Sequence, residues 1–207
     1  MQFRKAAMHI AIAGFLLASV PAFPGTFTII SQPTLSYTSS TELYSPTDPD
    51  FTVINSLGPF SFSSPLMELS VPDTWSTWGC PPNTESCSPR VLWTQGTDIL
   101  KLTLTKPDQK IVGFELEPNT FQTDDIRVEF FNGSTLVGVI DQMVNGQGGA
   151  LLFAAESNMP FTSILINDLS GDDFAIANLR SAPEPNVLTL LIPNLLFGAW
   201  LLRKLNL

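Results

Sequence analysis

Two glutamates separated by a single residue are the first candidates for a catalytic role in this sequence. Glu115 and Glu117 belong to the run VGFELE, residues 112–117. Side chains two positions apart on a strand point to the same side, so the two carboxylates should share one face. Paired carboxylates at a suitable separation can hydrolyse glycosides. A solvated strand face is the commoner cause of this spacing, so we assign no catalytic residue.

Histidine chemistry is excluded outside the first residues of the chain. The only histidine is His9, which lies in a predicted signal peptide. Ser-His-Asp and Cys-His catalysis and histidine-based zinc sites all need imidazole as a base or ligand. These classes of catalytic and zinc site are therefore excluded for the mature protein, which we expect to be non-enzymatic.

Aspartates gather in several predicted turns and offer a hypothesis for a metal site. Ca²⁺ takes roughly six to eight oxygen ligands, which acidic loops can supply. The turn with Asp168, Asp172 and Asp173 is the first candidate, ahead of the pairs at 48/50 and 124/125. The alternative is a set of solvated turn residues. No cofactor other than calcium is expected.

An irregular stretch, residues 71–90, holds tryptophans, prolines and both cysteines of the chain. Cys80 and Cys87 predict a disulfide that closes a small loop, because two thiolates alone do not fill a tetrahedral metal site. Trp75 and Trp78, with Trp93 just beyond, could stack on sugar rings. The alternative is that the tryptophans pack over the disulfide.

Short runs of alternating apolar and polar residues predict the elements that must position these groups. The runs lie roughly ten residues apart, and no segment of residues 23–180 keeps a helical period, so we expect an antiparallel β-sandwich or jelly-roll-like domain. Asn132-Gly133 predicts a type I′ hairpin turn. The expected strands cover residues 26–30, 34–37, 51–54, 60–71, 91–93, 100–104, 112–117, 126–130, 136–140, 151–154, 161–167 and 174–180.

The charge balance limits the partners of this domain. Residues 23–180 hold six Lys and Arg against 18 Asp and Glu, a net charge of −12. Such a surface repels nucleic acid and anionic lipid. Nucleic-acid binding is therefore excluded.

The first 22 residues have the pattern of a signal peptide. Arg4 and Lys5 precede an apolar run over residues 10–20, and small residues follow at Val20-Pro21-Ala22. We predict cleavage after Ala22 by signal peptidase. An uncleaved membrane anchor is the alternative, but the run is shorter than a membrane span.

The last 27 residues, 181–207, carry a second targeting pattern. Pro183, Glu184 and Pro185 precede an almost uncharged run over residues 187–202, and Arg203 and Lys204 follow it. As a helix this run would be roughly 24 Å long, slightly short of a hydrocarbon core of about 30 Å. A buried helix is the alternative, but it should show a polar face. We therefore predict a single membrane-spanning helix.

This tail resembles the PEP-CTERM sorting signal of exopolysaccharide-producing Gram-negative bacteria. The resemblance rests on the Pro-Glu-Pro triplet, the single hydrophobic segment and the basic end. It implies recognition and cleavage near the triplet by an exosortase, which is a membrane protease. More loosely, residues 112–117, 132–133, 160–164 and 174–180 are similar to the β-sandwich ectodomains found ahead of such tails.

Together these patterns predict an exported protein in three parts. They are a signal peptide (1–22), a β-sandwich ectodomain (23–180) and a sorting signal (181–207). The resemblance implies a transient stay in the inner membrane and then the cell-envelope surface or extracellular matrix. We expect a non-enzymatic ectodomain, and the alternative is a carbohydrate-binding module for exopolysaccharide.

Overall fold

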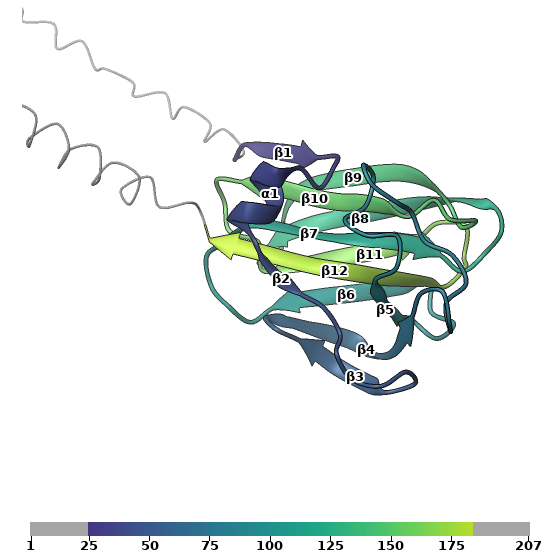
Figure 1. Ribbon diagram of the computed structural model, residues 1–207. Helices are drawn as coiled ribbons and strands as arrows, with labels where there is room; N and C mark the ends of the chain where they lie inside the picture. The colour runs from purple at the N-terminus through teal and green to yellow at the C-terminus, as the bar shows by residue number, and fades with distance from the viewer. Residues whose placement is uncertain (1–24, 184–207) are drawn as a thin grey trace, which may run out of the picture.

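The computed structural model describes residues 25–183 as two packed layers of antiparallel strands with one short helix (Figure 1). For this part of the chain, the predicted antiparallel all-β fold is confirmed. The elements are β1 (Phe27–Ile30), α1 (Leu35–Ser40), β2 (Glu42–Tyr44), β3 (Val53–Leu57), β4 (Phe60–Ser70), β5 (Arg90–Trp93), β6 (Ile99–Leu104), β7 (Gln109–Pro118), β8 (Thr123–Asn132), β9 (Thr135–Asn145), β10 (Leu151–Ser157), β11 (Ser163–Asp168) and β12 (Phe174–Pro183).

One continuous hydrogen-bonded sheet supplies both layers. Its strand order is β1-β10-β7-β12-β5-β4-β6-β11-β8-β9, with β2 added to β12 and β3 to β4. Strand β4 links the layers, because its residues 67–70 pair with β5 while residues 60–62 pair with β6. Pro65 lies between these two segments and cannot donate to a ladder, as is usual where a strand changes partners.

The core between the layers is built mainly from phenylalanine and branched aliphatic side chains. Phe114 and Phe153 stack from neighbouring strands, with ring centroids 6.0 Å apart. From the other layer, Phe130 contacts Phe161 at a centroid distance of 5.3 Å. The ring centroid of Phe27, on the edge strand β1, lies 5.5 Å from that of Phe130, so Phe27 closes the open side of the sandwich.

The outer faces of the two layers differ in what covers them. On β6, Lys101 and Thr103 are exposed while Leu100 and Leu102 are fully buried, which is the alternation of a half-solvated sheet. On β7, by contrast, residues 111–118 are buried on both faces. The layer that contains β7 therefore has a further covering of loop and helix on its outer side.

Two local predictions are wrong. The segment from Thr34 to Tyr37 was expected as a strand but opens helix α1, because the Thr34 hydroxyl caps it by accepting from the Tyr37 amide at 3.4 Å. The β8–β9 hairpin is present, but its loop is Gly133-Ser134, closed by the pair Asn132–Thr135. Of the loop residues only Gly133 has positive φ, at 58°, which corresponds to a type II′ rather than a type I′ turn.

Both ends of the described chain lie at one end of the sandwich (Figure 1). At the carboxyl end, Pro183 pairs with Gln109 at the start of β7. At the amino end, Phe27 pairs with Ser157 of β10, and the neighbouring Glu156 pairs with Ile111, which is also near the start of β7. Within residues 25–183, no helix has the length and apolarity needed to cross a bilayer. The predicted signal peptide (1–22) and membrane helix (187–202) lie outside the described residues.

The core position of Phe130 generates a stability prediction. Phe130 is fully buried, so Phe130→Ala should lower the free energy of unfolding by about 3–5 kcal/mol, because it removes apolar contacts and leaves a cavity. Urea denaturation would measure the change. The matched control is Phe121→Ala, whose side chain is 74% exposed and should change stability little. Equal effects of the two substitutions would contradict this packing.

Candidate functional site

Glu115 and Glu117 lie beneath the loop that joins β4 to β5. Neither side chain is exposed to solvent, although the sequence suggested a solvated strand face. That interpretation is wrong, because loop residues 71–89 fold over this side of β7. A buried carboxylate is costly unless hydrogen-bond donors surround it, so the partners of these two groups decide what the site can do.

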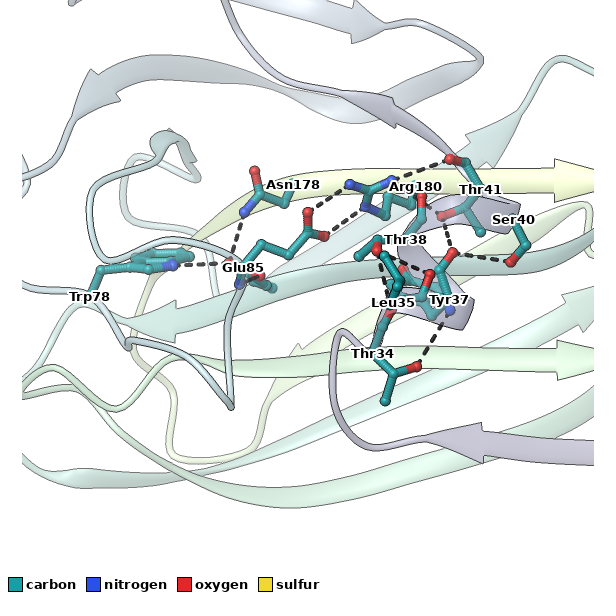
Figure 2. A network of polar contacts seen from close by, with 11 residues as sticks. Thr34, Leu35, Tyr37, Thr38, Ser40, Thr41, Trp78, Glu85, Asn178 and Arg180 are labelled. Carbon is teal, nitrogen blue, oxygen red and sulfur yellow. Dashed lines mark hydrogen bonds and ion pairs between the residues drawn. The ribbon is translucent and has the colours of Figure 1, made fainter.

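Both oxygens of Glu115 are occupied by donors. The Trp78 indole donates to Oε2 at 3.1 Å, and Asn178 Nδ2 donates to the same oxygen at 3.0 Å. The backbone amide of Glu85 donates to Oε1 at 2.6 Å. Figure 2 labels the two side-chain donors, Trp78 in the loop and Asn178 on β12, whose N–H groups are directed toward one acceptor. Both oxygens are thus bonded within the protein, and the side chain is fully buried, so Glu115 is not placed to contact a substrate.

Glu117 is held in the same way, two residues further along β7. The Trp75 indole donates to its Oε2 at 3.0 Å, and the Gly148 amide donates to its Oε1 at 2.7 Å. Each carboxylate thus receives one indole N–H from the β4–β5 loop. The repeated arrangement fixes the loop to the sheet at two points.

Burial also shifts the acidity of the two glutamates. It raises the pKa of Glu115 to about 7, because loss of water outweighs the donors that favour the charged form. The pKa of Glu117 is raised for the same reason. Elevated carboxyl pKa values often mark active sites, but such sites also need a cavity. Here tryptophan and backbone fill the space above the carboxylates.

The tryptophans considered as a possible sugar-stacking platform do not form one, because Trp75 and Trp78 lie in the interior of the domain. Trp75 and Trp78 are 7% and 5% exposed and pack in a small cluster with Leu69, Val71 and Val91. Their rings are therefore not available for stacking on a sugar. Trp93 is partly buried, and its indole N–H is bonded to Asp173.

The disulfide between Cys80 and Cys87 is confirmed. The loop that it closes contains Glu85, whose carboxylate forms a two-bond ion pair with Arg180 on β12, at 2.6 Å to each oxygen. The same guanidinium donates to the Thr38 and Thr41 carbonyls at 3.1 and 3.2 Å. Arg180 therefore joins the disulfide loop to the end of α1 (Figure 2).

Sequence patterns did not reveal this Arg180 clamp. Arg180 is 6% exposed and ends the otherwise uncharged run from Phe174 to Leu179. A cation at that place is the one available signal, since a buried strand rarely carries an unpaired charge. Its partner Glu85 could not be identified, because 95 residues separate the two in the chain.

The aspartates proposed as calcium ligands have different partners. Asp168 is buried and accepts from the Ser170 amide at 2.9 Å, whereas Asp173 accepts from Asn119 and from the Gly96 amide. Burial, with nearby Asp124 and Asp172, raises the pKa of Asp168 to about 6. Across residues 25–183, no three His, Cys, Asp or Glu side chains are grouped to hold a metal ion.

Only one residue of the sorting motif falls within the structure. Pro183 is the last residue of β12 and pairs with Gln109. Glu184, Pro185, Arg203 and Lys204 lie outside the described residues.

A groove of about 180 Å³ lies at the end of the sandwich away from Pro183. Ser76 and Thr77 line it from the β4–β5 loop, and Asn119, Thr120 and Phe121 line it from the β7–β8 connection. Gly146 completes this side, where a Cβ atom would lie 2.2 Å from the Thr120 carbonyl oxygen. Unlike Glu115 and Glu117, which are buried, these residues line a groove that is open to solvent.

Comparison with known proteins gives no family. No family model matches the chain, and no curated protein matches it. Among solved structures it is similar to a mutant of CBM29-2, a family 29 carbohydrate-binding module, at 11% identity and a TM-score of 0.31 over 76% of this chain and 91% of that one. It is also similar to the K1 cleaved adhesin domain of Lys-gingipain (Kgp) from Porphyromonas gingivalis W83, at 9% identity and a TM-score of 0.38 over 70% and 99%. Similarities this weak do not assign a function.

The raised pKa of Glu115 predicts how stability depends on pH. Glu115 titrates at about 7 when folded, against an ordinary value of 4.5. Between these values the folded state binds more protons than the unfolded state, so the free energy of unfolding should fall as pH rises, by up to roughly 3 kcal/mol. Urea denaturation at pH 5 and pH 8 would measure the fall. Glu115→Gln should reduce it, whereas Glu156→Gln, at an exposed position, should not.

The disulfide generates a separate prediction. The two cysteines are seven positions apart, so replacing both with serine should lower the free energy of unfolding by roughly 2–3 kcal/mol in the chain-entropy model. A reducing agent should have a similar effect on the unmodified protein and none on the double variant. Identical urea midpoints with and without reducing agent would show that the bond does not stabilise the loop.

Proposed function

We propose that this chain is an exported, non-enzymatic protein of the cell surface or extracellular matrix. Residues 1–22 act as the signal peptide, and residues 181–207 act as a sorting signal of the PEP-CTERM kind. Signal peptidase removes the first segment, and an exosortase-like membrane protease cleaves near Pro183–Pro185. The protein then leaves the inner membrane, where residues 187–202 held it.

The disulfide between Cys80 and Cys87 is the observation that carries the export proposal. Disulfides persist in oxidising compartments and are rare where thiols are kept reduced. This one lies in a loop that Arg180 and Glu115 tie to the sheet, so the bond belongs to the folded structure. The position of both ends of the described part, residues 25 and 183, at one end of the sandwich also supports attachment from a single side.

The non-enzymatic part of the proposal is supported by the state of the two glutamates. Glu115 and Glu117 are the paired carboxylates that sequence suggested for glycoside hydrolysis. Both are fully buried, and every oxygen accepts at least one hydrogen bond. A general acid or nucleophile must reach its substrate, and these groups reach only their own protein.

Exopolysaccharide binding through the tryptophans, the alternative function, lacks support in this geometry. Trp75 and Trp78 are buried, and their N–H groups are bonded to Glu117 and Glu115. Trp75 borders the groove described above but is only 7% exposed, so a glycan-binding surface there must use mainly other side chains.

Mass spectrometry of the exported protein tests the sorting proposal. We expect a chain that begins at Phe23 and ends near residues 183–185, without residues 187–204. Glu184→Ala combined with Pro185→Ala should retain the tail and leave β12 intact, because Pro183 is the last residue of that strand. An intact Leu207 on the unmodified exported protein would contradict the proposal.

A further inference from the structure

The groove beside the β7–β8 connection points to a ligand site. It lies at the end of β7 opposite to Gln109, the partner of Pro183. The ten residues of β7 span roughly 30 Å. The groove is therefore about the length of the sandwich away from both ends of the described chain, so an attachment at those ends would leave it accessible.

The groove has no charged lining, yet carboxylates lie directly behind it. Asn119 Nδ2 donates to Asp173 at 3.1 Å, and the Thr120 hydroxyl donates to Asp124 at 3.2 Å. Asn119 must turn its NH₂ group toward the carboxylate, which is a hydrogen-bond acceptor only, and its carbonyl oxygen remains free to accept. The lining therefore offers acceptors and repels anions, in keeping with the net charge of −12 over residues 23–180.

Phe121 gives the same groove an apolar wall. At 74% exposure it is the most exposed aromatic side chain among residues 25–183. Backbone bonds hold the loop on either side of it, from Asn119 N to the Asp173 carbonyl at 2.7 Å and from Gly146 N to the Gln122 carbonyl at 2.8 Å. The ring is thus carried on a fixed loop, which lowers the entropy lost on binding.

The Ser76 hydroxyl is a further polar group in the lining of the groove. Within the described part of the chain, the Ser76 side chain makes no hydrogen bond, and it lines the groove across from the β7–β8 connection. Ser76 can both donate and accept. The volume of about 180 Å³ is below the roughly 300–1,000 Å³ of pockets for drug-sized ligands, so the groove suits one ring of a larger molecule.

We propose that this groove binds a neutral saccharide. The Phe121 ring lies against the apolar face of one sugar ring, while Asn119 Oδ1 and the Ser76 hydroxyl bond its hydroxyl groups. A hydroxyl-rich neutral ring supplies donors to these acceptors and brings no negative charge toward Asp124 and Asp173. The proposal does not depend on the sorting signal or on cleavage of the tail.

Titration calorimetry with the full chain tests this site. The probes are β-1,4-glucan, β-1,4-mannan and α-1,4-glucan hexaoses, with a hexagalacturonate as the anionic counterpart. We expect at least one neutral hexaose to bind and the hexagalacturonate not to bind. Phe121→Ala should weaken binding roughly tenfold, and Asn119→Ala should weaken it several-fold, with thermal unfolding of Phe121→Ala unchanged.

Two control variants separate this groove from the rest of the surface. Phe131 and Leu136 lie at the far end of the β8–β9 hairpin, and Phe131 borders a different depression together with Lys101. Phe131→Ala and Leu136→Ala should bind as the unmodified protein does. Failure of all three neutral hexaoses, unchanged binding by Phe121→Ala, loss of binding by Phe131→Ala, or preference for the hexagalacturonate would each overturn the proposal.

Discussion

Two carboxylates on one strand, Glu115 and Glu117, determine how one face of this sandwich is covered. A buried carboxylate must be given hydrogen-bond donors, and the nearest strands can offer few, because their amides are used in the sheet. The β4–β5 loop supplies most of the donors as two indole N–H groups and one backbone amide, and Asn178 and the Gly148 amide supply the others. The long loop is therefore a third layer of the domain, and its tryptophans belong to the interior.

The disulfide and the Arg180 clamp help to hold the β4–β5 loop and α1 over the same face of the sheet. Cys80 and Cys87 close the part of the loop that holds Glu85, and Glu85 joins Arg180 through two short bonds. Arg180 in turn holds α1 through the Thr38 and Thr41 carbonyls. The buried charges of Arg180 and Glu85 are thus paired with each other, and Arg180 is also bonded to backbone, which suits a rigid scaffold. The open, uncharged groove at the distal loops is chemically different, and a ligand site fits there better.

Sequence alternation predicted most strands because one face of each is apolar, as in β6, β8 and β11. It failed where contacts with residues distant in the sequence, or a local cap, determine the secondary structure or the burial of a residue. Thr34 caps a helix that its β-favouring neighbours did not indicate, and the alternating glutamates of β7 gave the same pattern as a solvated strand. The disulfide followed from composition, whereas the Glu85–Arg180 pair could not, since nothing local links residues so distant. The groove also escaped prediction, because it is made by three separate loops.

The position of β12 in the sheet has a consequence for the order in which the domain can form. Strand β12 is the last to be synthesised, yet it lies between β7 and β5. Without it, β1, β10 and β7 form one hydrogen-bonded group, and β5, β4, β6, β11, β8 and β9 form another. In a chain that emerges amino end first, hydrogen-bonded strands therefore cannot join these two groups until residues 175–177 of β12 have appeared, because these residues pair with both β7 and β5. The continuous sheet can therefore be completed only after almost all of residues 25–183 has been synthesised.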